Sequence, residues 1–335
     1  MTTTYLQKRV LTGPQDIHNL APYKYPWAYD AWEAEFNNNW SPKEQGLGSD
    51  LLCYQQTLTE DERRLYFTIL STLTTTDIVV AENLAISIMR HITAPEISLY
   101  LGRQIGTETL HSVSYQFMIE TLGLDQEEVY TLYLKRPAIL WKFELASRYA
   151  ERLRNAKSVG DIIQAYWFWN QLVEGVWFMA GFLGLMSLPR RQLMTGTGTQ
   201  VLYIRRDEEL HVATGARILK AAMAEEGYRI PDAKMYEMVE AAVHAEHEFA
   251  EAEIPSILGY NANTHIQYVQ YLADLRLKDF GYKPYFNIEN PAPWDQELFV
   301  GNKMRNFFEA TVTDYKSAHA LEWEDEGDSL DLTRG

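Results

Sequence analysis

Glutamate and histidine residues recur three positions apart at two places in the sequence. The first is Glu108-x-x-His111, followed four residues later by Tyr115, and the second is Glu208-x-x-His211. Side chains three and four residues apart share one face of a helix. Iron and manganese accept carboxylate and imidazole ligands, and a neighbouring phenol could exchange an electron with the metal. Because the chain has 8 histidines, two such matches can arise by chance, and a metal site needs further ligands.

Two more acidic residues stand among apolar neighbours at corresponding distances from these pairs. Asp77, in TTTDIVVAENL, lies 31 residues before Glu108, and Glu174, in QLVEGVWF, lies 34 residues before Glu208. The chain therefore repeats one arrangement: a carboxylate, an interval that fits a helix and a turn, then Glu-x-x-His. This is the ligand set of dinuclear iron or manganese sites in ferritin-like bundles. We predict a dinuclear metal site held by Asp77, Glu108, His111, Glu174, Glu208 and His211.

Charge balance favours this interpretation of the six residues. Four carboxylates carry four negative charges, and two divalent metals carry four positive ones. Burying four uncompensated carboxylates would be prohibitive, whereas a neutral cluster is tolerable. For any single member, a surface charge or a hydrogen bond in the core is the simpler explanation. For all six together, that explanation is disfavoured.

The elements that would position these residues are long helices. Thr59-Glu60-Asp61-Glu62 has the form of a capping box, and the pattern after it stays helical toward His91. Pro95 fits the first turn of the next helix and Gly123 its end. Further helices are predicted at 126–135, 137–155, 160–188 and 262–279. Another helix ends at about residue 226, and one more begins at residue 231. The glycines at 196 and 198 suggest a local distortion. No segment alternates as a strand does.

These patterns predict an all-α fold, a ferritin-like bundle of long antiparallel helices around the metal site. We divide the chain into an N-terminal extension with a short helix (1–58), the bundle (59–282) and a C-terminal segment with an acidic tail (283–335). The apolar stretch 165–188 could be read as a membrane span. Asn170, Gln171 and Glu174 interrupt it without a basic flank, so we favour the central helix of a bundle.

Composition indicates the compartment of the protein and the kinds of partner that it does not bind. The 335 residues carry a net charge of −16 and no basic stripe, so binding to nucleic acid is not expected. The single cysteine, Cys53, excludes an internal disulfide framework and fits a reducing compartment. The N-terminus lacks the apolar core of a signal peptide. We therefore expect a soluble, cytoplasmic protein without membrane association.

A second acidic and histidine-containing segment, AAVHAEHEFAEAE, does not support a metal site. It is mostly alanine and charge, and no facing segment of similar chemistry is evident. A solvated helix face is the simpler explanation for its members, which are Glu240, His244, His247, Glu248 and Glu251.

From Trp40 to the acidic tail, the chain resembles the small, radical-generating subunit of class I ribonucleotide reductase. The resemblance is carried by Asp77, Glu108-x-x-His111-x-x-x-Tyr115, Glu174 and Arg206-Asp207-Glu208-x-x-His211. It implies a dinuclear centre that reacts with oxygen and oxidises Tyr115 to a stable tyrosyl radical. A radical survives only where water and reductants are excluded. The resemblance places an apolar pocket around the tyrosine at Phe178, Phe182 and Ile204.

The resemblance also implies a route by which the oxidising equivalent leaves. It runs from the metal through His111 and Asp207 to Trp40, and Tyr315 passes it to a partner subunit. Asp207 would accept the ring N–H of His111. The acidic DSLDL at 328–332 resembles the tail that docks on the large subunit, although the ending Thr333-Arg334-Gly335 departs from the family. The family is typically a homodimer.

The leading functional hypothesis is therefore a subunit that supplies a radical for reduction of ribonucleotides to deoxyribonucleotides. Cys53 alone cannot form the dithiol that this reduction needs, so a large subunit would supply it. The alternatives are a ferritin-like dimetal or ligand-binding oxidase that works without a large subunit, and a helical scaffold without metal. Asp77 and Tyr115 favour a di-iron, tyrosyl-radical type, while HITAPEISLYLGRQ resembles the tyrosine-less manganese–iron branch. Manganese–iron and dimanganese centres therefore remain open.

Overall fold

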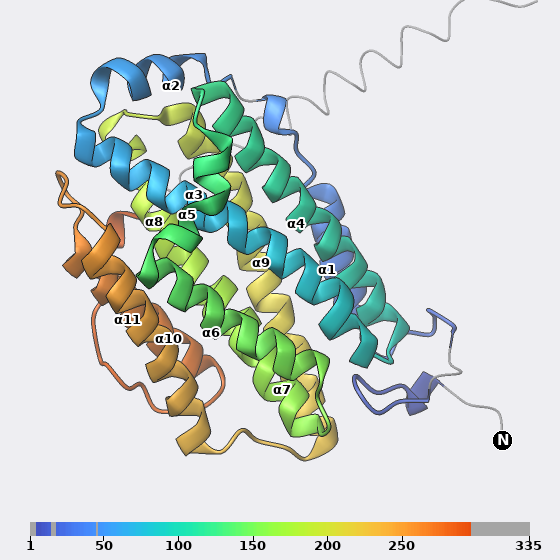
Figure 1. The fold of residues 1–335 in the computed structure, drawn as a ribbon. Coiled ribbons are helices and arrows are strands. Elements are labelled where there is room, and N and C mark those ends of the chain that lie inside the picture. The colour runs from blue at the N-terminus through green and yellow to red at the C-terminus, as the bar shows by residue number, and fades with distance from the viewer. Residues whose placement is uncertain (1–4, 15–17, 45, 296–335) are drawn as a thin grey trace, which may run out of the picture. The chain divides into compact units, whose positions relative to one another are not determined.

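The computed structural model describes residues 5–14, 18–44 and 46–295, and over these it is built from helices (Figure 1). Within these ranges the only β-type pairing is an isolated bridge between Ile257 and Tyr260. The prediction of an all-α fold is confirmed. The α-helices of five or more residues are α1 (Pro26–Asn37), α2 (Gly48–Leu52), α3 (Glu60–Asn83), α4 (Pro95–Leu122), α5 (Gln126–Lys135), α6 (Pro137–Arg154), α7 (Val159–Trp167), α8 (Met179–Met186), α9 (Thr195–Glu226), α10 (Asp232–Glu253) and α11 (Ala262–Asp279).

The long helices begin and end at residues suited to those positions. Thr59 Oγ1 accepts the backbone N–H of Glu62 at 3.3 Å, and Glu62 Oε2 accepts the N–H of Thr59 at 2.8 Å, so the capping box forms. Pro95 occupies the first turn of α4, and Gly123, with φ of 66°, ends that helix. Gly227, with φ of 59°, ends α9 in the same way. Glycine adopts this left-handed conformation without steric cost.

The predicted distortion at the glycines of α9 is absent from the structure. Gly196 lies in the first turn of the helix, where backbone N–H groups have no partner within the helix. The buried carboxylate of Asp50 accepts the N–H groups of Gly196 at 3.0 Å and Thr197 at 2.6 Å. The glycine permits close approach, because a Cβ there would lie 2.9 Å from the Leu47 side chain.

The apolar stretch that could be read as a membrane span is the central helix of the bundle. It consists of α7, the π-helix η6 (Phe168–Phe178) and α8, and 94% of its most apolar 18-residue window is buried. Helices α3, α6, α9 and α11 pack around it. The other long apolar helix, which begins with α3, has 61% of such a window buried. The central helix is therefore almost wholly covered by protein, and the helix that begins with α3 is covered over most of this window.

Four helical segments surround the predicted metal site, and a fifth lies against two of them. Asp77 is on α3, the first Glu-x-x-His on α4, Glu174 on η6 and the second Glu-x-x-His on α9. Helix α1 packs against α4 and α9 (Figure 1). The described residues up to Pro291 form one compact unit. The predicted boundaries after residues 58 and 282 stay predictions, and Tyr315 and the 328–332 tail lie outside the described residues.

Candidate metal centre

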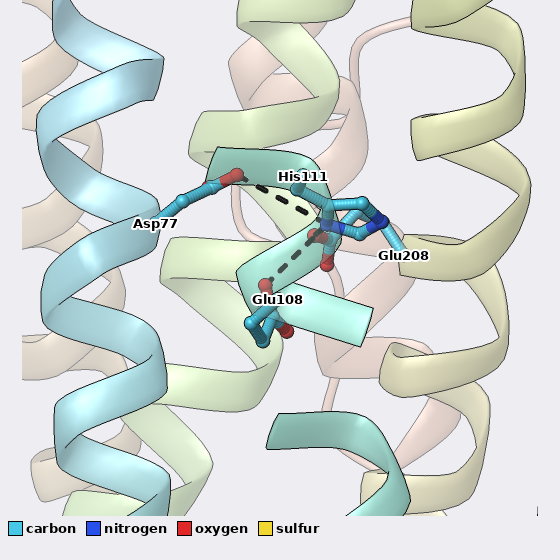
Figure 2. Close-up of side chains that lie close together, drawn as sticks. All are labelled: Asp77, Glu108, His111 and Glu208. Atoms are coloured by element: carbon cyan, nitrogen blue, oxygen red, sulfur yellow. Dashed lines mark ion pairs between the residues drawn. The ribbon is translucent and has the colours of Figure 1, made fainter. Parts of the chain in front are cut away.

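Three helices bring four of the predicted ligands together in the interior of the bundle. Asp77 from α3, Glu108 and His111 from α4 and Glu208 from α9 point toward one another (Figure 2). One potential ligand atom from each of the four lies within 4.8 Å of those of the others. All four residues are fully buried. The arrangement is therefore a closed cluster of donor atoms and not a surface group of charges.

The two Glu-x-x-His turns contact each other crosswise. His111 Nδ1 lies 3.1 Å from Glu208 Oε1, and His211 Nδ1 lies 2.9 Å from Glu108 Oε1. Each histidine also lies near the glutamate of its own turn, at 3.5 Å for His111 and 3.3 Å for His211. The Nδ1 atoms of both imidazoles thus face the carboxylates, and these are the ring atoms that could bind a metal at this site.

The opposite ring nitrogens face two further carboxylates. His111 Nε2 lies 3.5 Å from Asp207 Oδ2, longer than a usual hydrogen bond, and His211 Nε2 lies 2.7 Å from Glu35 Oε1. Glu35 is not among the site residues predicted from the sequence. The available signal was its place on α1, since it lies seven residues after Ala28 and four after Ala31, both buried. A carboxylate on the apolar stripe of a helix needs an internal partner.

Glu174 approaches the cluster from the π-helix. Its Oε2 accepts a hydrogen bond of 2.8 Å from Asn170 Nδ2, which also donates to the backbone carbonyl of His211 at 3.1 Å. Asn170 in turn packs on Gly215 of α9, where a Cβ would lie 2.3 Å from its amide group. Asn170 therefore connects Glu174 to the second Glu-x-x-His turn. π-Helical segments occur frequently at functional sites.

The electrostatics of the cluster are those of crowded, buried carboxylates. Burial, and then the charges of Glu108 and Glu208, raise the pKa of Asp77 and of Glu174 well above their usual values. Burial alone would also raise the pKa of Glu108, but His211 and His111 hold it at about 2. Burial would lower the pKa of both histidines, and the surrounding carboxylates raise it instead.

The donor set fits two divalent cations. Both carboxylate oxygens of Asp77 and of Glu108, and Oε1 of Glu208, are buried and accept no hydrogen bond in the structure. Acceptors without donors are costly in a protein interior unless a cation satisfies them. Four carboxylates would balance the charge of two divalent ions. Together with the two imidazoles, they supply ligand types that iron and manganese accept.

Tyr115 lies on α4, one turn after His111, and is fully buried. Its hydroxyl has no hydrogen-bond partner in the structure. Burial, and then the charges of Asp77, Glu208 and Glu108, raise its pKa well above the usual value of 10.0. The predicted pocket residues are buried too, with the ring centroids of two of them 6.3 Å apart. These are Phe178, Phe182 and Ile204, and their packing on Tyr115 stays a prediction.

Trp40 is connected to the cluster through Asp207. The indole N–H of Trp40 donates to Asp207 Oδ2 at 2.7 Å, and Trp40 is almost fully buried. The same Oδ2 faces His111 Nε2, while Arg206 donates to Oδ1 from Nε at 3.2 Å and from Nη2 at 3.1 Å. The structure thus brings together three members of the predicted exit route.

The second histidine-containing segment lies on α10. Ligand atoms of His247, Glu248 and Glu251 come within 4.8 Å of one another, but the two glutamates are exposed. Water solvates such carboxylates at little cost, so their proximity does not require a metal.

A buried carboxylate–histidine cluster inside a bundle of long helices defines a ferritin-like fold with a candidate metal site. A family model described as ribonucleotide reductase, small chain, matches residues 17–292. The chain therefore belongs to the ribonucleotide reductase small-chain family, and it is an oxidoreductase subunit. It is 34% identical over 321 residues to the ribonucleoside-diphosphate reductase subunit beta of Chlamydia pneumoniae, with 92% of each chain covered.

Solved structures agree with this assignment. The ribonucleotide reductase R2 subunit from Clostridium botulinum superposes with a TM-score of 0.78 at 27% identity, covering 87% of this chain and 94% of that one. An R2-like ligand-binding oxidase with a manganese–iron cofactor superposes with a TM-score of 0.67 at 18% identity, covering 80% and 98%. The second likeness supports the fold alone.

Proposed function

We propose that this chain is the radical-generating small subunit of a class I ribonucleotide reductase, with Tyr115 as the residue that stores the radical. The observation that carries the proposal is the surroundings of Tyr115. Its phenol is fully buried, has no hydrogen-bond partner, and lies one helical turn from a cluster of unpaired carboxylate oxygens. A phenoxyl radical in such a place is shielded from water and from soluble reductants.

Six residues would hold the metals: Asp77, Glu108, His111, Glu174, Glu208 and His211. When bound, the metal pair supplies the capacity to reduce oxygen and to remove one electron from a neighbouring group. The chain supplies the positions of the ligands, a dry interior and control of protons. Because burial and nearby carboxylates raise the pKa of Tyr115, its hydroxyl oxygen keeps the proton until the electron leaves.

Export of the oxidising equivalent is the second part of the proposal. Trp40, Asp207 and His111 would form the inner end of the route, and the contacts among them support this role. Tyr315 would continue the route to a large subunit, which reduces the ribonucleotide, and the 328–332 tail would dock there. We also propose a cytoplasmic homodimer, as in the family that the sequence resembles.

For the metal pair we propose two iron ions, since Asp77 and Tyr115 resemble the tyrosyl-radical type. Carboxylate and imidazole ligands accept manganese equally well, so manganese–iron and dimanganese pairs are the alternatives. Metal analysis after oxygen activation distinguishes the three.

A ligand-binding oxidase is the second candidate, supported by the similarity of fold to a protein of that name. Such a protein needs room for an organic molecule. The cavity beside Phe178, between α3, α6 and η6, has a volume of about 30 Å³, the space of about two water molecules. Turnover of an organic substrate without any large subunit would favour this candidate.

Electron paramagnetic resonance tests the main proposal. Protein loaded with metal and exposed to oxygen is expected to give a tyrosyl radical signal that Tyr115→Phe abolishes. Tyr66→Phe is the matched control, because Tyr66 is equally buried but its hydroxyl bonds to Thr197. A signal that persists in Tyr115→Phe would overturn the assignment.

A further inference from the structure

Glu35 contacts the candidate metal centre from outside the four ligand-bearing segments. It lies on α1, is 2% exposed, and its Oε1 is 2.7 Å from His211 Nε2. Carboxylates that accept the second N–H of a metal-bound histidine fix its tautomer and raise its basicity. Glu35 Oε1 is placed to take this role for His211 Nε2, although the two atoms do not form a hydrogen bond in the structure. The other ring nitrogen, Nδ1, faces Glu108 Oε1 at 2.9 Å and Glu208 Oε2 at 3.3 Å, which is the side where a metal would bind.

The carboxylates behind the two histidines differ in charge compensation. Asp207, behind His111, accepts two N–H groups of the Arg206 guanidinium and the indole N–H of Trp40. Glu35, behind His211, has only the Thr107 hydroxyl at 3.4 Å as a further side-chain partner in the described part of the chain.

The nearest arginine does not neutralise Glu35. Arg103 Nη2 donates to the main-chain carbonyl of Glu35 at 3.3 Å and to Asn39 Oδ1 at 2.6 Å. Among the residues that the structure describes, no lysine or arginine forms an ion pair with the Glu35 carboxylate. The half of the site around His211 therefore carries one more uncompensated negative charge than the half around His111.

We propose that Glu35 is a positioning residue that makes the two halves of the metal centre unequal. By fixing the His211 tautomer and adding a buried negative charge, it makes the His211 half bind its ion more tightly and favour the more oxidised state. This inference rests on the proposed dinuclear site and adds an asymmetry to it. Helix α1, which packs on α4 and α9, thereby becomes part of the centre.

The charge difference is tested with two matched variants, each of similar shape to the residue it replaces. Glu35→Gln removes the charge behind His211, and Asp207→Asn removes the charge behind His111. Titration of the full chain with Mn²⁺, followed by the electron paramagnetic resonance signal of the free ion, gives the dissociation constants of the two sites. We expect each variant to weaken a different site by about 10- to 100-fold.

The reduction potential separates an electrostatic role from a structural one. In the iron-loaded protein, Glu35→Gln is expected to raise the potential of one site by about 59 mV for each tenfold loss of preference for the oxidised ion. The unfolding midpoint of the metal-free variant serves as the structural control and is expected to stay near that of the wild type.

Three results would overturn the inference. They are unchanged potentials and affinities in Glu35→Gln, equal weakening of both sites, and weakening of the same site by both variants. If the wild type binds no Mn²⁺ and no iron, the proposed dinuclear function itself fails. Two bound ions in the wild type with no effect of Glu35→Gln would leave that function standing and reject only the asymmetry.

Discussion

His111 Nδ1 lies 3.1 Å from Glu208 Oε1, so the imidazole of one Glu-x-x-His turn contacts the carboxylate of the other. The two residues are 97 positions apart in the sequence and belong to α4 and α9. Neither turn is complete without the other, because His211 makes the reciprocal contact with Glu108. The site therefore exists only when these two helices are packed together.

Metal binding is expected to stabilise the fold. The buried carboxylates repel one another, and a ligand that binds only the folded state adds about 2.7 kcal/mol per site at 100 times its dissociation constant. Calorimetry should show a higher Tm with Mn²⁺ or Fe²⁺ and a lower Tm after chelation. His247→Ala, in the exposed group on α10, should leave the metal-induced shift unchanged. Loss of the shift in that variant would mean that the metal binds on α10.

Gly215→Ala is expected to weaken metal binding through Asn170. The added Cβ would lie 2.3 Å from the Asn170 amide, which holds Glu174. Overpacking of this kind costs about 1–3 kcal/mol in folding free energy. The measurements are urea unfolding and Mn²⁺ affinity. Gly102→Ala is the matched control, since a Cβ there meets nothing within 4 Å and alanine favours a helix. Equal unfolding stability and equal Mn²⁺ affinity of the two variants would contradict the role of Asn170.

Trp40→Phe is expected to impair nucleotide reduction and to leave metal binding intact. Trp40 contacts Asp207 and none of the carboxylate ligands by hydrogen bond, so the two ions should still bind. Loss of the indole N–H should lower activity with the large subunit by at least about tenfold, because one hydrogen bond to a charged group contributes about 1.5–3 kcal/mol. Trp32→Phe, on α1, serves as the control. Full activity of Trp40→Phe would remove this residue from the route.

Acid is expected to destabilise the protein partly through Glu246. Burial would raise its pKa, but Lys142 and His265 lower it below the ordinary value of 4.5. The unfolded chain therefore takes up this proton at a higher pH than the folded chain. The stabilisation is present above pH 4.5 and is lost as the pH falls below that value.

Urea unfolding between pH 3.5 and pH 7 checks this expectation. Glu246→Gln combined with Lys142→Met removes the pair without leaving a buried lysine unpaired. The double variant should lose less stability on acidification than the wild type. Parallel pH profiles would assign the acid sensitivity to other carboxylates.

The helices could be predicted from the sequence because their ends carry local signals, such as Thr59, Pro95 and Gly123. The six candidate ligands could be proposed because their spacing repeats. Glu35 escaped, since a lone carboxylate on a short amphipathic helix looks like a surface residue until α1 is packed against α9. The π-helix escaped too, because no residue type marks the change in backbone hydrogen bonding. Asn170 became meaningful only through its contact with Gly215.

The π-helix between Phe168 and Phe178 limits which deletions the central helix can accept. Each residue turns an α-helix by about 100°. If one residue were deleted between Glu174 and Phe178 and the backbone kept its hydrogen-bonding pattern, the segments before and after the deletion would rotate relative to each other by roughly a quarter of a turn. Either Glu174 or Phe182 could then keep its place, but not both. The orientation of the central helix toward Tyr115 thus depends on the number of residues in η6 as much as on their identity.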